Sequence, residues 1–274
     1  MKYILVTGAA SGIGKAITET MARRGWKVFA ADQNKEVLRS MEAKNIIPIY
    51  MDVTKEKTII DAFIKVAKET LYLDVIINSA GIRYITSLIE EDLNKLQKAI
   101  DVNLIGMIRV NNLFFSLLNK ETGRIINISS ESGWISPSPF NGVDSISKHA
   151  VDAYNDTLRR ELNFLGVKVI KIEPGPFKTP MRQNTIDSFK ELIDNTKYYK
   201  NELKNMSRLM KNEFKNSENI KYLLYSIVQA CESKKPKIRY RVKNNISLVL
   251  MNLLPEYIID KIYYNKLKPK KAIK

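Results

Sequence analysis

Cysteine and histidine are nearly absent from this chain. Its 274 residues include one cysteine, Cys231, and one histidine. A single cysteine allows no intrachain disulfide and no cysteine metal cluster, and it suits a reducing compartment. We therefore expect no metal site, and we expect Cys231 to fill space in the apolar core.

The sequence also lacks a long uninterrupted apolar run. No stretch is long enough to span a bilayer, and the first residues lead directly into a glycine-rich segment, without a charged leader and an apolar core. Hydrophobic residues make up 45% and charged residues 27% of the chain. This composition excludes disorder of the whole chain and predicts a cytoplasmic protein with one domain over residues 1–274.

The net charge of +16 is unevenly distributed. Residues 1–182 contain 25 Lys and Arg against 20 Asp and Glu, whereas residues 183–274 contain 20 against 9. The apolar run 246–254 precedes several lysines at the end of the chain: Lys266, Lys268, Lys270, Lys271 and Lys274. Residues 245–274 thus predict a basic and apolar C-terminal extension. A solvated basic tail beside an ordinary core or dimer helix is the favoured interpretation, and peripheral contact with an anionic membrane is the alternative. No nucleic-acid-binding motif accompanies the charge, so no nucleic-acid partner is expected.

Residues 7–14 read Thr-Gly-Ala-Ala-Ser-Gly-Ile-Gly and carry the strongest local signal. An apolar, strand-like run at residues 3–6 precedes them, and a helical pattern follows. Glycines remove side chains where a pyrophosphate or a neighbouring strand comes close, and the N–H groups of the first helical turn bind the anion. The segment therefore predicts a nucleotide phosphate site formed by Gly8, Ser11, Gly12, Ile13 and Gly14. A plain turn between strand and helix is the alternative.

A second apolar run, residues 27–31, ends at Asp32. In dinucleotide-binding folds a carboxylate about 20 residues after the glycines accepts hydrogen bonds from the adenosine ribose and repels a 2′-phosphate. Ser11 and Gln33 stand where a cationic side chain would favour that phosphate. The spacing predicts NAD rather than NADP as the cofactor, and a simple capping role for Asp32 is the alternative.

Strand-like and helical patterns alternate along the rest of the chain. Apolar runs occupy residues 46–51, 75–78, 124–128 and 167–172, and helical patterns occupy residues 59–71, 92–118 and 146–165. This alternation predicts an α/β fold, a Rossmann-type doubly wound parallel sheet with helices on both faces and the ligand at the carboxyl ends of the strands. Residues 180–216 interrupt the alternation and predict a mobile substrate lid; a surface insertion without function is the alternative.

Further motifs follow the glycine segment in an order that resembles the short-chain dehydrogenase/reductase family along nearly the whole chain. They are Asp52-Val53, Asn78-Ser79-Ala80-Gly81, Asn103 in Val-Asn-Leu-Ile-Gly, Ile128-Ser129-Ser130, Ser147-Lys148, and Pro174-Gly175-Pro176-Phe177-Lys178-Thr179. The resemblance implies that Asp52 and Val53 flank the adenine and that Asn78, Ala80 and Gly81 lie along the ribose. It also implies a nicotinamide-binding segment of Pro174, Gly175 and Phe177, in which Thr179 holds the carboxamide. Capping and turn formation are the alternatives for the single residues.

The same resemblance implies that three side chains share the proton transfer, a serine, a lysine and a tyrosine, with an asparagine behind them. Ser130 would hydrogen-bond the substrate oxygen, with Ser129 as an adjacent candidate, Lys148 would bind the ribose, and Asn103 would hold a relay water. The family's tyrosine lies four residues before the lysine, and this chain has Asp144 there. An aspartate is shorter than a phenol and is normally ionised at neutral pH, so it is a poor proton donor for carbonyl reduction.

The resemblance implies an NAD(P)-dependent oxidoreductase for a secondary alcohol or ketone, with proton transfer weakened or rerouted through Ser130, Asn103-bound water or Asp144. Residues 172–180 and 235–242 suggest the hydroxysteroid and retinol dehydrogenase-like branch, and hence an apolar, steroid- or lipid-like substrate. A non-catalytic NAD-binding regulator or scaffold, a possible pseudoenzyme, is the first alternative. A membrane-surface or partner-binding module is the second. The resemblance also implies a homodimer or homotetramer with helices 92–118 and 146–165 at the interface.

Overall fold

The computed structural model of the chain describes residues 1–91, 93–215 and 217–268. Within them one sheet contains seven parallel strands in the order β3-β2-β1-β4-β5-β6-β7. In chain order the strands are β1 (Tyr3–Thr7), β2 (Lys27–Asp32), β3 (Ile46–Tyr50), β4 (Val75–Asn78), β5 (Arg124–Ile128), β6 (Lys168–Pro174) and β7 (Arg239–Val242). The order reverses between β1 and β4, so the predicted doubly wound parallel sheet is confirmed.

Helices connect the strands and extend beyond the last one. They are α1 (Gly12–Arg23), α2 (Lys35–Ser40), α3 (Glu56–Glu69), α4 (Leu93–Ile100), α5 (Gly106–Phe114), α6 (Gly142–Asn163), α7 (Met181–Asn195), α8 (Lys200–Lys215), α9 (Lys221–Glu232), α10 (Ile246–Met251) and α11 (Glu256–Leu267). Shorter turns are the π-helical η1 (Asp101–Ile105) and the 3₁₀ turns η2 (Phe115–Leu117) and η3 (Glu131–Gly133).

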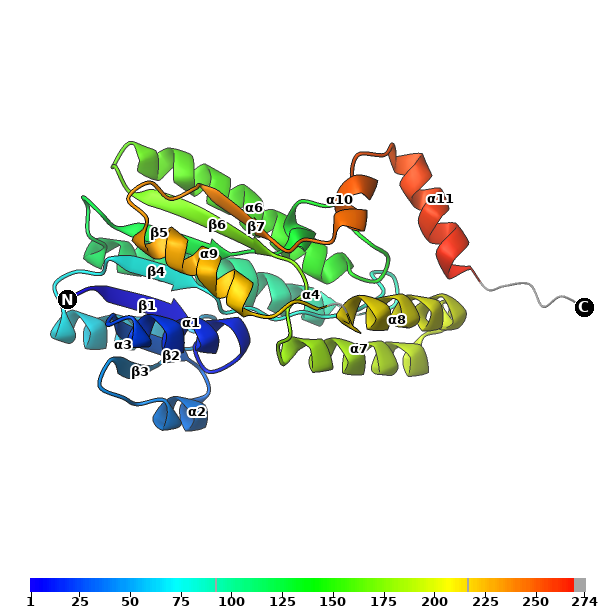
Figure 1. Cartoon of the computed structure of the whole chain (residues 1–274). Helices are drawn as coiled ribbons and strands as arrows, with labels where there is room; N and C mark the ends of the chain where they lie inside the picture. Colours follow the sequence, from blue (N-terminus) through cyan, green and yellow to red (C-terminus); the bar gives the residue numbers. More distant parts are fainter. Residues whose placement is uncertain (92, 216, 269–274) are drawn as a thin grey trace, which may run out of the picture.

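Alternating side chains of the strands build two apolar layers. In β1, Ile4 and Val6 face the layer that contains residues of α1 and α9, whereas Leu5 faces the layer with residues of α3, α5 and α6. Successive residues of a strand point to opposite faces, so a sheet covered on both sides needs apolar residues throughout. Figure 1 shows α1 and α9 on the near face of the sheet. Cys231 belongs to the first layer as predicted, and burial raises the pKa of its thiol to about 12.

Two elements differ from the prediction. The pattern over residues 92–118 predicted one helix, but the structure divides it into α4, η1, α5 and η2, and residue 92 lies outside the described residues. The strand β7 was not predicted, because its sequence Arg-Tyr-Arg-Val is half charged. Arg239 and Arg241 in this edge strand pair with the buried Glu173 of β6. Ion pairs therefore occupy positions in β7 where the other strands have apolar side chains.

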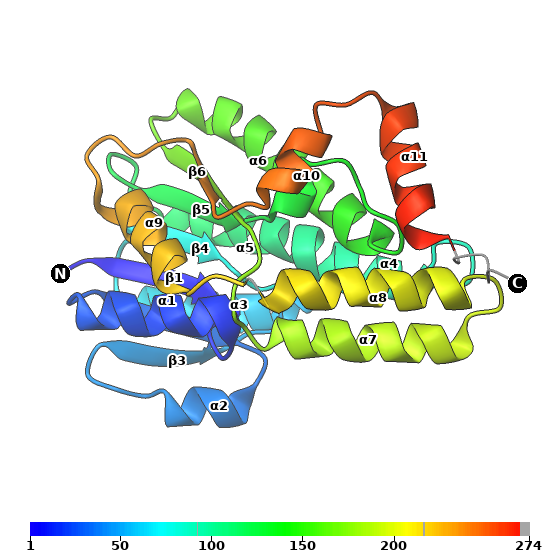
Figure 2. The ribbon, with the colours of Figure 1, turned by 45° about the vertical axis from the view of Figure 1, so that its right-hand side comes forward.

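Residues 181–215 form the antiparallel pair α7 and α8, which extends from the carboxyl ends of the strands (Figures 1 and 2). Phe189 and Leu192 of α7 and Leu203 and Met206 of α8 belong to a third apolar cluster. The segment predicted as a lid is therefore a packed helical pair. Its motion stays a prediction, and residue 216 lies outside the described residues.

The C-terminal extension contains α10 and α11, and α11 lies against α8 (Figure 2). Leu267 of α11 joins the third apolar cluster. Lys270, Lys271 and Lys274 of the predicted basic tail lie outside the described residues. Among the helices that the structure describes, none is both long and apolar enough to cross a bilayer.

Candidate cofactor and active site

A cavity of 680 Å³ lies at the carboxyl ends of the strands, around the point where the strand order reverses. The loop after β1, the ends of β2 to β6, and residues of α6, α7, α8 and α10 line it. This is the position where doubly wound sheets bind ligands, because neighbouring crossovers leave on opposite faces and open a crevice between them.

Close backbone contacts shape the glycine loop at one side of the cavity. Gly8 has a φ of +69°, and a Cβ there would lie 2.8 Å from the backbone of Ala80. A Cβ on Gly14 would lie 2.0 Å from the carbonyl oxygen of Gly8. Thr7 Oγ1 accepts hydrogen bonds from the N–H groups of Ser79 and Ala80, both at 3.1 Å. These contacts hold the loop after β1 against the loop after β4.

The N-terminus of α1 fits a phosphate group. Ser11 is the N-cap residue, and its side chain makes no capping hydrogen bond. The N–H groups of a first helical turn have no partner within the helix, and together with the helix dipole they bind anions. Gly12, with a φ of +51°, has Thr179 and Pro180 of the opposite wall 3.9 Å from the position of a Cβ. A dinucleotide pyrophosphate suits this cradle.

Two carboxylates lie along the same wall. Asp32 ends β2, where its Oδ2 accepts from Ala10 N at 3.0 Å and its Oδ1 accepts from Asn34 N at 2.9 Å. Asp52 Oδ1 accepts from the N–H of Thr54 at 3.0 Å and from its hydroxyl at 2.7 Å. Burial raises the pKa of Asp52, but the hydrogen bonds from Thr54 and the charge of Lys55 outweigh it, so the pKa lies below its usual value.

Most residues that the sequence predicts for the site line this one cavity. They are Gly8, Ser11, Gly12, Ile13, Gly14, Asp32, Asp52, Val53, Ala80, Gly81, Ser130, Asp144, Lys148, Pro174, Gly175, Phe177 and Thr179. Sequence positions from both halves of the sheet are thus brought together at one edge.

Asn78 and Asn103 lie behind the wall instead. Asn78 Nδ2 donates to Asn111 Oδ1 at 2.8 Å and to Asn127 Oδ1 at 2.9 Å, so it ties β4 to α5 and β5. Asn103 lies in η1, where its Oδ1 accepts from Ile82 N at 2.8 Å and its Nδ2 donates to Ile82 O at 2.9 Å. Asn103 thereby fixes the backbone of the loop after β4, and π-helical turns of this kind are frequent at functional sites.

The two candidate serines have different surroundings. Ser129 is buried, and its hydroxyl donates to Asp152 Oδ1 at 2.5 Å, while Asp152 Oδ2 accepts from the buried Lys171 at 2.6 Å. Ser130 Oγ accepts from Ser132 N at 3.1 Å, which leaves its O–H able to donate to a ligand. Since the Ser129 proton is already donated to a carboxylate, Ser130 is the better candidate of the two.

Asp144 and Lys148 lie in the first turns of α6, and an arginine that the sequence analysis missed joins them. Asp144 Oδ2 lies 3.6 Å from Arg83 Nε, and the Asp144 side chain is 5% exposed. Lys148 Nζ lies 3.4 Å from Ile128 O, and burial lowers the pKa of Lys148. Arg83 follows the Asn-Ser-Ala-Gly motif by two positions, so a cation beside a strand end was the signal that could have revealed it.

Comparisons with known proteins identify relatives of this chain and of its fold. A family model described as short chain dehydrogenase matches residues 2–189. The chain is 33% identical to mouse retinol dehydrogenase 16 over 99% of this chain and 91% of that one. It is 31% identical to an NADPH-dependent 3-dehydrocapnine reductase of Ornithobacterium rhinotracheale, over 98% of each chain. A short-chain dehydrogenase from Streptomyces avermitilis, 22% identical, superposes with a TM-score of 0.71 over 97% of each chain, which supports the fold.

The contact between Gly14 and Gly8 gives a test of the cradle. Gly14→Ala places a methyl group into the Gly8 carbonyl, so the loop must shift, and we expect NADH affinity to fall at least about tenfold. Fluorescence titration measures the affinity, and circular dichroism checks the fold. Lys15→Ala, an exposed neighbour, serves as the control. Unchanged NADH binding by folded Gly14→Ala would contradict the assignment.

Proposed function

Since the chain belongs to the short-chain dehydrogenase family, we propose that it is an NAD-dependent oxidoreductase that acts slowly on a secondary alcohol or ketone. One observation supports this most directly: the glycine cradle, Asp32 and the group Ser130, Asp144 and Lys148 line the same cavity. Bound nicotinamide supplies or accepts a hydride in such a site. The protein's own task is then to orient the substrate oxygen and to move one proton.

The side chains present are better suited to orienting the substrate oxygen than to moving the proton. The Ser130 hydroxyl is free to donate to a substrate oxygen, whereas Asp144 is paired with Arg83. A carboxylate accepts hydrogen bonds and cannot supply the proton that carbonyl reduction consumes. We infer that Asp144 replaces the family's tyrosine and that turnover is therefore slow. The alternative is an NAD-binding protein without catalysis.

NAD preference rests on Asp32. Backbone N–H groups of Ala10 and Asn34 fix its carboxylate at the end of β2 within the cavity. There it can accept from the ribose hydroxyls, and its charge repels a 2′-phosphate. Gln33 beside it carries no compensating charge.

The outer part of the cavity suits an apolar substrate. Met181 of α7, Met210 and Phe214 of α8, and Leu248 of α10 line it. Apolar walls with a few polar groups are typical of small-molecule sites. Together with the similarity to a retinol dehydrogenase, this favours a steroid-, retinoid- or lipid-like alcohol or ketone.

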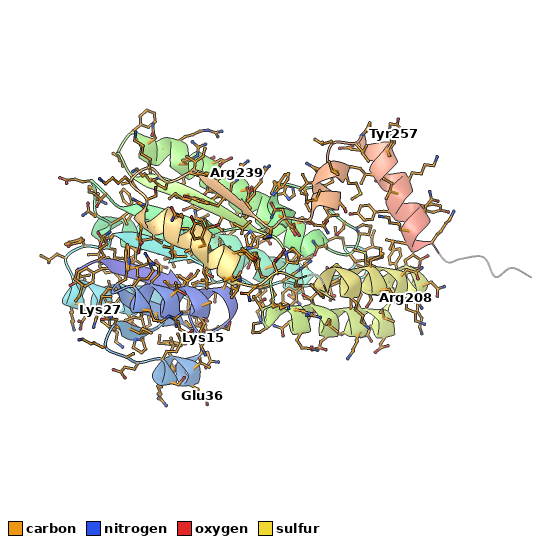
Figure 3. All side chains as sticks on the ribbon, viewed as in Figure 1. Lys15, Lys27, Glu36, Arg208, Arg239 and Tyr257 are labelled. Atoms are coloured by element: carbon orange, nitrogen blue, oxygen red, sulfur yellow. The ribbon has the colours of Figure 1, made fainter. Side chains whose placement is uncertain are left out.

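The opposite side of α10 favours peripheral membrane contact as a second role. Ile246, Leu250, Leu253 and Tyr257 are more than half exposed, although all are large and apolar. Figure 3 labels Tyr257 at the start of α11, on the edge of the molecule away from the sheet. Lys261 and Lys266 of α11, the helix that begins beside the patch, are also exposed, and apolar and cationic side chains together bind anionic lipid surfaces. An apolar substrate would then enter beside α10.

Turnover before and after Asp144→Tyr tests the proposed reaction. We expect the wild-type chain to bind NADH and to react slowly with members of a panel of secondary alcohols and ketones. Asp144→Tyr should raise kcat about 10- to 100-fold, because a phenol is a competent acid and base. His149→Tyr, which adds a phenol one residue beyond Lys148 at an exposed position, should give no gain. Fast wild-type turnover would refute the inference about Asp144. Absence of NADH binding would refute both the proposed oxidoreductase and the alternative of a non-catalytic NAD-binding protein.

Titration with both reduced cofactors tests the role of Asp32. NADH should bind at least about tenfold more tightly than NADPH, which corresponds to about 1.4 kcal/mol. Asp32→Ser should reduce the difference between the affinities for NADH and NADPH, since it removes the charge that repels the 2′-phosphate. Asp52→Asn should weaken the binding of both cofactors by the same factor. Comparable wild-type affinities would show that Asp32 does not select the cofactor.

Sedimentation with lipid vesicles tests the membrane contact. The chain should sediment with anionic vesicles at low salt and remain in solution with neutral ones, because the attraction is electrostatic and screened by salt. Leu250→Asp with Leu253→Asp should abolish binding. Leu71→Asp, at a side chain that is 90% exposed and follows α3, should leave it unchanged. No sedimentation at low salt would rule the contact out.

A further inference from the structure

Arg83 is fixed in the cavity by two residues at the start of α6. Its Nη2 donates to Asn141 Oδ1 at 3.0 Å, and its Nε lies 3.6 Å from Asp144 Oδ2. Asn141 Nδ2 in turn lies 3.5 Å from Asp144 Oδ2. The three side chains therefore form a closed triangle, which holds the guanidinium in one place.

The backbone around Arg83 is held equally well. Asn103 bonds both the N–H and the carbonyl of the preceding residue, Ile82. Three residues further on, Thr86 N donates to Phe140 O at 3.0 Å. The loop after β4 is thus attached to η1 on one side and to the segment before α6 on the other, so Arg83 lies on a rigid support.

The guanidinium keeps donors available to a ligand. It has five N–H donors. One N–H of Nη2 is used by Asn141, and Nε is buried beside Asp144. The donors left for a ligand are therefore those of Nη1 and the second N–H of Nη2. Arg83 lines the same cavity as Ser130, Asp144 and Lys148. A fixed cation with free N–H groups is suited to an oxygen on which negative charge develops.

Lys148 has the properties of a proton donor. Burial lowers the pKa of Lys148, and the charge of Arg83 lowers it further, while Asp144 on the same helix and Asp152 one turn beyond oppose both effects. Its ammonium therefore releases a proton more readily than that of a solvated lysine. The guanidinium of Arg83 cannot do this, because arginine stays charged in proteins.

We propose that two residues perform the tyrosine's task in this chain: Arg83, positioned by Asp144, binds the reacting oxygen, and Lys148 Nζ exchanges the proton with it. This rests on the proposed function. In ketone reduction a hydride from the reduced nicotinamide forms the new C–H bond, and the carbonyl π electrons move onto oxygen. An O–H bond then forms with a proton from Lys148 Nζ as the N–H bond breaks, and the neutral amine regains its proton from water. The ketone is reduced and the nicotinamide is oxidised.

A double-mutant cycle tests this arrangement. Arg83→Gln in the otherwise wild-type chain should lower kcat/KM for reduction about 100-fold, with the Kd for NADH changed less than about twofold. In the Asp144→Tyr background, Arg83→Gln should lower kcat/KM for reduction less than about threefold, because the new phenol binds the substrate oxygen and supplies the proton. Arg23→Gln, at a side chain of α1 that is 70% exposed and pairs with Glu19 outside the cavity, should have no effect in either background.

A second readout needs neither cofactor nor turnover. The pH dependence of Lys148 acylation, followed by mass spectrometry on the protein alone, reports the pKa of Lys148. Arg83→Gln should raise that pKa because it removes a neighbouring positive charge, whereas Arg83→Lys should keep it low and should retain part of the activity. In the wild-type chain kcat/KM for reduction should fall as the pH rises through this pKa, since the donor is then deprotonated.

The outcomes separate this inference from the proposed function. No NADH binding contradicts the proposed function itself. NADH binding without any wild-type turnover overturns the role of Arg83 and Lys148. Unchanged kcat/KM in Arg83→Gln, or an equal loss in both backgrounds, also overturns it, because the arginine would then be dispensable or merely structural.

Discussion

The close approach of two backbone loops at the reversal of the strand order determines much of this structure. Gly8 lies against the backbone of Ala80, and Gly14 lies against Gly8, at distances that leave no room for a side chain. Thr7 closes the contact through its hydroxyl. Because β1 and β4 are adjacent parallel strands, this contact defines the floor of the crevice, and the positions of α1 and of the loop carrying Arg83 follow from it.

Charged groups are placed where the apolar layers end. Lys171 of β6 is 1% exposed, and it is surrounded by the carboxylates of Asp152, Asp156 and Glu173. A buried charge is tolerated only when it is paired and hydrogen-bonded. This network extends through Asp152 to Ser129, whose hydroxyl donates to that carboxylate, whereas Ser130 Oγ accepts from Ser132 N. Two hydroxyls that are adjacent in the sequence therefore have different partners.

The success of prediction from sequence differed between elements for physical reasons. Strands β1 to β6 were recognised because a sheet covered on both faces requires continuous apolar runs. Strand β7 was missed because Arg239 and Arg241 pair with Glu173, a contact that no local pattern encodes. The helix predicted over residues 92–118 is interrupted at η1, where Asn103 bonds the backbone of Ile82. Residues 181–215 form two helices that pack together through a shared apolar cluster. That packing joins two separate segments and is not visible in the local sequence pattern.

The sequence by itself determined the parallel sheet, the glycine loop, the carboxylate at Asp32 and the position of Asp144 four residues before Lys148. These features depend on backbone conformation, periodicity and spacing, which neighbouring residues specify. Only the tertiary structure decided that Ser129 is bound to Asp152, that Asn103 supports the loop after β4 instead of lining the cavity, and that Arg83 lies against Asp144. Those contacts join residues far apart in the chain, and they form because parallel strands bring all their carboxyl ends to one edge of the sheet.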